Sequence, residues 1–176
     1  FFDCIRNGGV NPETGKTTAD YCDIDSLARL YWLNEITKCV DGFNYSSTYL
    51  FKNSDASDDS RFVFGPAWDF DLAMGNALSS QSSDSYLSPQ GWLTRNALLG
   101  SRLLQDPRVR AAVDAVKQEV LDEARGCING QDYLAYESSV ATSVNMESIL
   151  WGVSSESPDD VRAWLNSRLD WLETAQ

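Results

Sequence analysis

Apolar residues in the second half of the chain recur at the spacing of amphipathic helices. The clearest stripe follows Asp106 and Pro107, which are typical of a helix cap and first turn, and it runs to Gly126, where we expect the helix to stop. Residues 92–105 predict a helix before it, and residues 132–151 repeat the pattern less cleanly. A capping-box-like start at residues 157–160 predicts a terminal helix. The stripe of that helix consists of Val161, Trp164, Leu165, Leu169 and Leu172.

The first half begins with what we interpret as the tail of a helix, followed by a loop at residues 7–15. Asp25 and Ser26 then predict an N-cap, and residues 27–40 predict a helix. Because this helix is apolar on nearly all sides, we expect it to lie buried at the centre of the domain.

The period of the pattern then changes. Residues 47–52 alternate and are rich in β-formers, residues 53–60 are polar, and residues 61–64 predict a second short strand closed by Gly65 and Pro66. A Ser- and Gln-rich segment at residues 77–91 is expected to be a mobile surface loop, of a length that favours a function. The predicted fold is therefore mainly α with one small β-hairpin, and residues 1–176 are expected to form a single domain.

Composition narrows the possible functions. The chain has 176 residues and a net charge of −12, with 14 Lys and Arg against 26 Asp and Glu, which argues against nucleic-acid binding. It contains no His, so histidine-based triads and zinc sites are excluded within it. No apolar run is long enough for a membrane span. The four cysteines, at positions 4, 22, 39 and 127, fit either disulfides of an exported protein or free buried thiols.

Without His, the candidate chemistry rests on carboxylates in loops. Asp41 lies in the turn after the buried helix, and Asp69 and Asp71 lie in the turn after the hairpin. A hairpin returns the chain to its starting point, so we expect the carboxylates of Asp41 and Asp69 to lie on the order of 4–8 Å apart. Carboxylates held together repel one another unless a proton or a cation lies between them, and Mg²⁺ with substrate phosphates is the natural occupant.

The same order of elements occurs in the large lobe of protein kinases, where a catalytic-loop Asp precedes a hairpin and a metal-binding Asp follows it. The block Gly-Pro-Ala-Trp-Asp-Phe-Asp at residues 65–71 closely resembles the signature of the CotH family, the spore coat protein H kinases. The resemblance extends to Asn34-Glu35-Ile36, to Asp41-Gly42-Phe43 and to residues 46–52. The closing helix, with Trp164, Arg168 and Trp171, is also similar, so that the resemblance covers nearly the whole chain.

This resemblance implies an atypical protein-kinase fold, of which the chain is the large-lobe part without the upstream small lobe, that transfers phosphate from Mg-ATP to protein hydroxyls. Asp41 would be the catalytic acid that orients or deprotonates the acceptor. Asp69 would bind the metal, Asp71 would be a second metal residue or a supporting one, and Trp68 would pack beneath the nucleotide. Partners would be ATP and a protein substrate or surface partner, and the location would be secreted or at the cell surface.

Three features depart from an active kinase. We expect the small lobe with its phosphate-clamping Lys to lie outside these residues. Ser46 stands where kinases place a metal-binding Asn, and Asp71 replaces the glycine of the Asp-Phe-Gly turn. We therefore expect this fragment to be inactive or nearly so. The alternatives are a non-catalytic CotH-like surface or adhesion module and a plain helical interaction domain.

Each candidate residue also has a structural interpretation. Asp41 before Gly42 is a common turn pair, Asp71 fits a cap of the next turn, and Trp68 is expected to pack in the core. Arg168 is expected to form a buried ion pair or to cover apolar surface with its stem.

Overall fold

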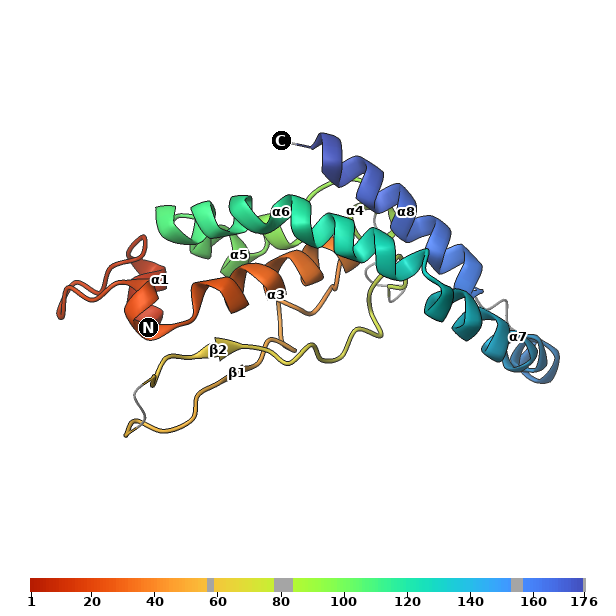
Figure 1. Ribbon diagram of the computed structural model, residues 1–176, viewed down its shortest axis with the longest axis horizontal. Coiled ribbons are helices and arrows are strands. Elements are labelled where there is room, and N and C mark those ends of the chain that lie inside the picture. The colour runs from red at the N-terminus through yellow and green to blue at the C-terminus, as the bar shows by residue number, and fades with distance from the viewer. Residues whose placement is uncertain (57–58, 78–83, 153–156, 176) are drawn as a thin grey trace.

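The computed structural model describes residues 1–56, 59–77, 84–152 and 157–175. It is mainly helical, with one two-stranded antiparallel sheet, which confirms the predicted fold class (Figure 1). The elements are, in order, α1 Phe2–Arg6, α2 Thr18–Tyr21, α3 Ile24–Thr37, β1 Leu50–Phe51, β2 Val63–Phe64, α4 Asp84–Leu87, the 3-10 helix η2 Thr94–Asn96, α5 Leu98–Leu103, α6 Pro107–Ile128, α7 Gln131–Trp151 and α8 Pro158–Thr174. None of the described helices combines the length and apolar character that crossing a membrane requires.

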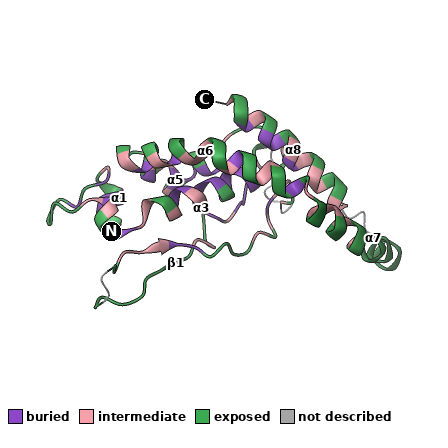
Figure 2. Ribbon diagram, in the orientation of Figure 1, coloured by how far each residue is buried: buried purple, intermediate pink, exposed green. Residues whose placement is uncertain are grey.

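Helix α3 is the buried centre of the molecule, as its sequence predicts. It packs against α6, α8 and strand β2, and both faces of the helix carry buried residues (Figure 2). Its boundaries differ from the prediction. The N-cap is Asp23, whose side chain accepts from the Ser26 amide, and the helix ends at Thr37 because Lys38 adopts a left-handed conformation with φ 48°. The prediction of a helix over residues 27–40 therefore placed both ends about three residues too late along the chain.

The hairpin is present but shorter than the alternating pattern predicts. In the described residues the ladder pairs Leu50 with Phe64 and Phe51 with Val63, and the Gly65 amide also donates to the Tyr49 carbonyl at 3.0 Å. Phe64 is buried and stacks on Phe43 with ring centroids 6.3 Å apart, which fixes the base of the hairpin on the core. Phe62 of the predicted second strand pairs instead with the chain before α3, because its amide donates to the Tyr21 carbonyl at 2.7 Å and its carbonyl accepts from the Asp23 amide at 2.8 Å. The hairpin tip at residues 57–58 lies outside the described residues.

The segment that predicts one helix at residues 92–105 is broken into η2 and α5. Ala97 is extended, with ψ 152°, between them. The break has a tertiary cause, because the Glu35 carboxylate of α3 accepts the amide protons of Leu93 and Arg95. Within the broken segment, Gly100 packs so closely on the Thr94 carbonyl that a Cβ would lie 1.9 Å from its oxygen.

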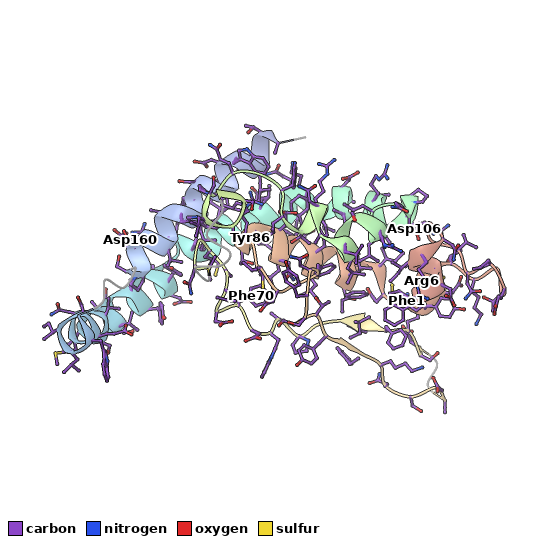
Figure 3. All side chains as sticks on the ribbon, turned by 180° about the vertical axis from the view of Figure 1, so that it is seen from behind. Phe1, Arg6, Phe70, Tyr86, Asp106 and Asp160 are labelled. Atoms are coloured by element: carbon purple, nitrogen blue, oxygen red, sulfur yellow. The ribbon has the colours of Figure 1, made fainter. Side chains whose placement is uncertain are left out.

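Helix α6 begins as predicted, with the Asp106 side chain capping the Arg108 amide and Pro107 in the first turn. It continues past Gly126 to Ile128, so the predicted stop at Gly126 is wrong. The start of α6 also anchors the N-terminal loop, because Arg108 Nη2 donates to the Gly9 carbonyl at 2.8 Å. In Figure 3, Phe1, Arg6 and Asp106 accordingly lie at one end of the molecule and Asp160 lies toward the other.

Helices α7 and α8 close the chain. The predicted capping box at Ser157 and Asp160 is present, and the stripe of α8 is buried at Leu165, Leu169 and Leu172. In contrast, α7 projects from the body and has no buried residue (Figure 1). Its last turn exposes Trp151 by 74%.

All four cysteines are free in the structure. Cys4, Cys22 and Cys39 are buried and Cys127 is exposed, an arrangement that fits the free-thiol alternative. Part of the Ser- and Gln-rich segment, residues 78–83, lies outside the described residues, and its end forms the single turn of α4.

Candidate functional site

The loops that carry Asp41 and Asp69 lie side by side, as the hairpin predicts. Two main-chain hydrogen bonds join them: the Val40 amide donates to the Leu72 carbonyl at 2.9 Å, and the Met74 amide donates to the Thr37 carbonyl at 2.6 Å. The chain that leaves α3 is thus fixed directly to the chain that leaves the hairpin. The two candidate acids therefore lie on adjoining loops, although they are separated by the whole hairpin in sequence. The distance of about 4–8 Å expected between their carboxylates stays a prediction.

Cys39 fills the junction between these loops. Its side chain is 1% exposed, and Sγ lies 3.9 Å from the Asp69 carbonyl oxygen. Burial raises the pKa of this thiol, the main-chain N–H groups of Gly42 and Asp41 lower it, and the carboxylates of Asp41 and Asp69 raise it. The thiol therefore stays protonated at neutral pH and acts as a small packing group between the two acidic loops.

Asp69 is held in a strained backbone conformation. Its φ is 64°, and its Oδ2 accepts a hydrogen bond from Ser47 Oγ at 3.1 Å. Ser47 itself has φ 58°. The described residues other than Gly that have positive φ all lie in or beside the two loops: they are Lys38, Phe43, Ser47, Asp69 and Met74. Such strain costs on the order of 1–3 kcal/mol per residue and concentrates at functional sites, so its confinement to these loops favours a functional role.

Asp41 opens a tight turn whose geometry depends on the next residue. The Asp41 carbonyl accepts the amide protons of Tyr45 and Ser46 at 2.9 and 3.0 Å. Gly42 packs on α3 so closely that a Cβ would lie 1.8 Å from Asn34 Oδ1. The turn thus sits directly on the buried helix, and Asp41 itself is half-buried.

The other two candidates are more exposed. Asp71 is exposed, and its carbonyl accepts from Asn76 Nδ2 at 2.7 Å, so its observed role is that of a turn residue. Trp68 is 56% exposed, with its ring edge-on to Tyr49 at 6.0 Å. The expectation that Trp68 packs in the core is therefore wrong, because the extended chain at residues 65–70 turns this side chain outward.

The oxygen donors near Asp69 suit a hard cation. Carboxylates and hydroxyls are ligands that Mg²⁺ accepts, usually one or two carboxylates with water and phosphate oxygens completing the shell. Among the described residues, no group of three or more Cys, Asp or Glu side chains is placed to hold a metal ion. A cation here would therefore rest on Asp69, with Asp41 or Asp71 and the oxygens of a bound phosphate.

Two residues at these loops are not indicated by the sequence pattern. Ser46 stands where kinases place a metal-binding Asn, but the hydroxyl that contacts Asp69 is that of Ser47, and Ser46 Oγ lies 3.3 Å from Ser47 Oγ. Cys39 was considered only as a disulfide or core residue. The position of Cys39 directly before the Asp41 turn indicates that it lies near the candidate site. The neighbouring sequence does not indicate its contact with Asp69, which is 30 residues away.

Three buried charges hold the end of the Ser- and Gln-rich segment and the residues after it. Arg168 pairs with Glu35 and donates to the carbonyls of Pro89 and Gly91, and Lys38 donates to those of Ser88 and Gln90 at 2.8 and 2.7 Å. Lys38 lies three residues before Asp41, so this clamp connects residues 88–95 with the start of the candidate loop.

A model of a known protein family matches the chain over nearly its whole length. This model, described as CotH kinase protein, covers residues 2–172. The chain belongs to the CotH kinase family. A kinase-like relationship therefore holds at the level of the family. Comparisons of this CotH chain with curated proteins and with solved structures found no match.

The block at residues 65–71 carries the sequence resemblance to the CotH family. In the structure, this block and the residue after it contact Cys39 and Val40, which lie directly before Asp41. The expected buried pair of the closing helix is also present, between Arg168 and Glu35. The closing helix of the CotH match and the loop that follows the hairpin therefore both contact α3 or its C-terminal end.

Proposed function

We propose that this CotH chain is the large-lobe part of an atypical protein kinase that transfers phosphate from Mg-ATP to hydroxyl groups of proteins. The observation that carries the proposal is the joining of the Asp41 and Asp69 loops, with Asp69 in the left-handed conformation and hydrogen-bonded to Ser47. Family membership supports the same reaction class.

The proposed roles follow from position. Asp41, on the rigid turn above α3, orients the acceptor hydroxyl and accepts its proton. Asp69 holds Mg²⁺, with Asp71 as a second or supporting carboxylate. When bound, Mg²⁺ neutralises charge on the transferred phosphoryl group. The exposed ring of Trp68 offers a flat apolar surface beside Asp69 against which a nucleotide can pack.

A non-catalytic surface or adhesion module is the second candidate. It is favoured by the serine hydroxyls at positions 46 and 47, which are poorer Mg²⁺ ligands than an Asn amide oxygen, and by three aromatic side chains near the site that are about half exposed or more. These are Tyr45, Tyr49 and Phe51. On either proposal we place the protein outside the cell or on its surface, as the family resemblance implies.

The direct test replaces Asp69 by Asn in a polypeptide that joins this chain to the upstream small lobe of the kinase. We expect loss of Mg²⁺-dependent ATP binding and of phosphate transfer to protein, because the site loses the carboxylate that holds the cation. Asp55→Asn removes the same charge from the exposed hairpin and is the matched control. Unchanged Mg-ATP affinity and turnover in Asp69→Asn would remove the role assigned to Asp69 and favour the non-catalytic module.

The 176-residue chain alone is proposed to fold but to bind ATP no tighter than about millimolar. A kinase nucleotide site lies between two lobes, and this chain contributes one of them. Its net charge of −12 also repels a polyphosphate. Micromolar binding of Mg-ATP by the chain alone, measured by calorimetry, would contradict the proposal that it holds half of the site.

A further inference from the structure

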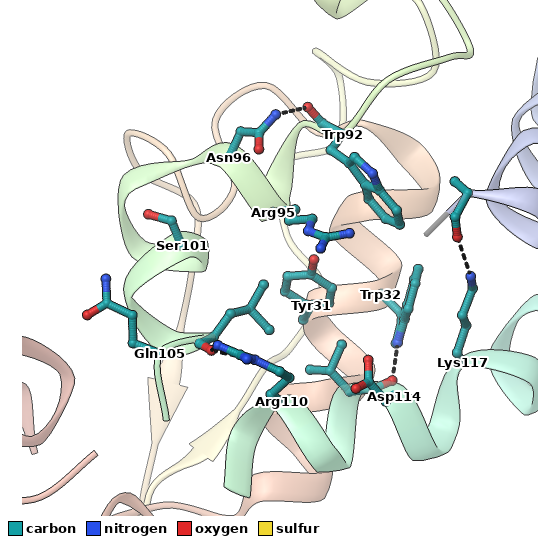
Figure 4. A pocket seen from close by; sticks show the side chains of 13 residues that line it. Tyr31, Trp32, Trp92, Arg95, Asn96, Ser101, Gln105, Arg110, Asp114 and Lys117 are labelled. Carbon is teal, nitrogen blue, oxygen red and sulfur yellow. Dashed lines mark hydrogen bonds between the residues drawn. The ribbon is translucent and has the colours of Figure 1, made fainter. Parts of the chain in front are cut away.

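An open cavity of about 540 Å³ lies between α3, the η2–α5 segment and α6 (Figure 4). This volume is within the range of about 300–1,000 Å³ that small-molecule sites occupy. The floor is made by Tyr31 and Trp32 of α3, which are 2% exposed, and by Trp92. None of the residues of the Asp41 and Asp69 loops lines the cavity, so it is separate from the candidate kinase site.

The charge of the cavity is opposite to that of the chain. Arg95, Arg110 and Lys117 line it, and Asp114 is the single acid among the described residues of the lining. The whole chain, in contrast, has nearly twice as many acidic as basic residues. The cavity is therefore a positive spot on an acidic protein, which attracts anions that the rest of the surface repels.

Main-chain carbonyls hold two of these cations in place. Arg110 donates through Nε and Nη2 to the Leu104 carbonyl at 3.0 and 2.6 Å, and Lys117 Nζ donates to the Ala175 carbonyl at 3.0 Å. In the described part of the chain neither side chain forms an ion pair, so a carbonyl orients each charge and no carboxylate neutralises it. Both retain N–H donors for an incoming anion.

The aromatic floor is rigid. The Trp32 indole N–H donates to the Val113 carbonyl at 2.7 Å, and its ring lies 6.4 Å from Trp92. Arg95 lies 4.8 Å from the centroid of the Trp92 ring, and Lys117 lies 5.9 Å from that of Trp32. Positive charge and flat apolar surface are thus placed next to each other, as Figure 4 shows.

We propose that this cavity is a binding site for a small organic anion that carries an aromatic ring. The ring packs against Trp92, the half-buried indole of the floor, and the anionic group lies among the cations of Arg95, Arg110 and Lys117. Tight binding requires both the aromatic ring and the anionic group in one molecule. A ring without charge gains nothing from the cations, and an inorganic anion gains nothing from the indoles.

The test uses 2-naphthalenesulfonate as the probe, with neutral 2-naphthol and inorganic sulfate as comparisons, in calorimetric titrations of the 176-residue chain. We expect the aromatic sulfonate to bind at least tenfold more tightly than either comparison. The double variant Arg110→Gln/Lys117→Gln is expected to lower its affinity about tenfold or more, since each cation contributes roughly threefold near a solvent-exposed rim. Comparable affinities for the three probes would overturn the proposal.

The matched control is Arg125→Gln, which removes the same kind of charge from α6 outside the cavity and is expected to leave the affinity within about twofold. Asp114→Asn removes the one acid and should tighten binding of the sulfonate. This second variant keeps the test decisive if the double variant fails to fold. Equal effects of the cavity variants and of Arg125→Gln would mean that only net charge matters, and would reject the site. None of these outcomes depends on ATP or on phosphate transfer.

Discussion

Arg168 and Glu35 form an ion pair in which both side chains are 0% exposed, with Nη2 2.8 Å from Oε1. Both side chains of the pair also form hydrogen bonds with main-chain groups. Arg168 also donates to the carbonyls of Glu35, Pro89 and Gly91, and the Glu35 carboxylate accepts the amide protons of Leu93 and Arg95. The pair therefore joins α3 to α8 and fixes the chain between them.

Replacing Arg168 by Met is the first prediction. The variant leaves the Glu35 carboxylate buried without a cation, which costs about 3–5 kcal/mol of unfolding free energy. Urea denaturation followed by circular dichroism measures this loss. Arg125→Met is the control, because Arg125 pairs with Asp170 and Glu173 near the surface and exposed pairs contribute about 0–1 kcal/mol. Equal losses in the two variants would contradict the importance assigned to the buried pair.

The second prediction concerns Lys38, which is 1% exposed. Burial lowers its pKa from 10.5 to about 8; the charge of Arg168 lowers it further and that of Glu35 opposes the shift. Between these two pKa values the unfolded chain binds a proton that the folded chain does not, so this group makes the protein more stable as pH rises. A neutral amine still has two N–H donors for the carbonyls of Ser88 and Gln90.

The measurement compares wild type with Lys38→Met by urea denaturation at pH 7 and pH 9.5. The unfolding free energy of the wild type should rise relative to that of the variant by about 2 kcal/mol over this interval. The comparison is made as a difference because the thiol of Cys22, whose pKa burial raises to about 12, shifts stability in the opposite direction above pH 9 in both proteins. A difference that does not change with pH would show that Lys38 titrates normally.

The helical framework and the hairpin were predictable because they follow from local pattern. The cap at Asp106 and the capping box at Ser157 need only neighbouring residues, and both are present. The ends of α3 and the break at Ala97 were not predictable, because left-handed Lys38 and the Glu35 carboxylate are tertiary constraints. Of the two roles expected for Arg168, a buried ion pair and the covering of apolar surface, the ion pair is observed, but its partner lies 133 residues away in the sequence.

The candidate site shows the same division. The adjacency of the Asp41 and Asp69 loops follows from the hairpin, because two paired strands return the chain to where it started. The orientation of single side chains depends on backbone dihedrals that the pattern does not contain. Trp68 was therefore wrongly expected in the core, and Ser47, not Ser46, contacts Asp69. The Asp41, Asp69 and Asp71 roles in binding metal and acceptor stay predictions.

The third prediction distinguishes the two interpretations of the cysteines. If the thiols are free, as in the structure, a thiol reagent added without reductant to the unfolded chain should modify all four. In the native protein only the exposed Cys127 should react quickly, because Cys4, Cys22 and Cys39 are at most 1% exposed and burial raises the pKa of Cys22 and Cys39. Mass spectrometry of the labelled protein gives the count and the position. Two unreactive cysteines in the unfolded chain would indicate a disulfide.

The fourth prediction compares two glycines with opposite surroundings. Gly42→Ala places a Cβ 1.8 Å from Asn34 Oδ1, inside the packed junction between α3 and the Asp41 turn. Because the turn must shift or Asn34 must lose its hydrogen bond to the Leu30 carbonyl, we expect a loss of at least about 2 kcal/mol of unfolding free energy. Gly126→Ala lies within α6, where no atom comes within 4 Å of the added Cβ, and should raise the unfolding free energy by about 0.5–1 kcal/mol. Thermal and urea denaturation of both variants check the signs.

Because the Asp41 turn rests on Gly42, Gly42→Ala should also weaken any Mg²⁺-dependent nucleotide binding in the two-lobe polypeptide, whereas Gly126→Ala should leave it unchanged. If Gly42→Ala is as stable as the wild type, the turn does not pack on Asn34 and the rigid placement proposed for Asp41 fails.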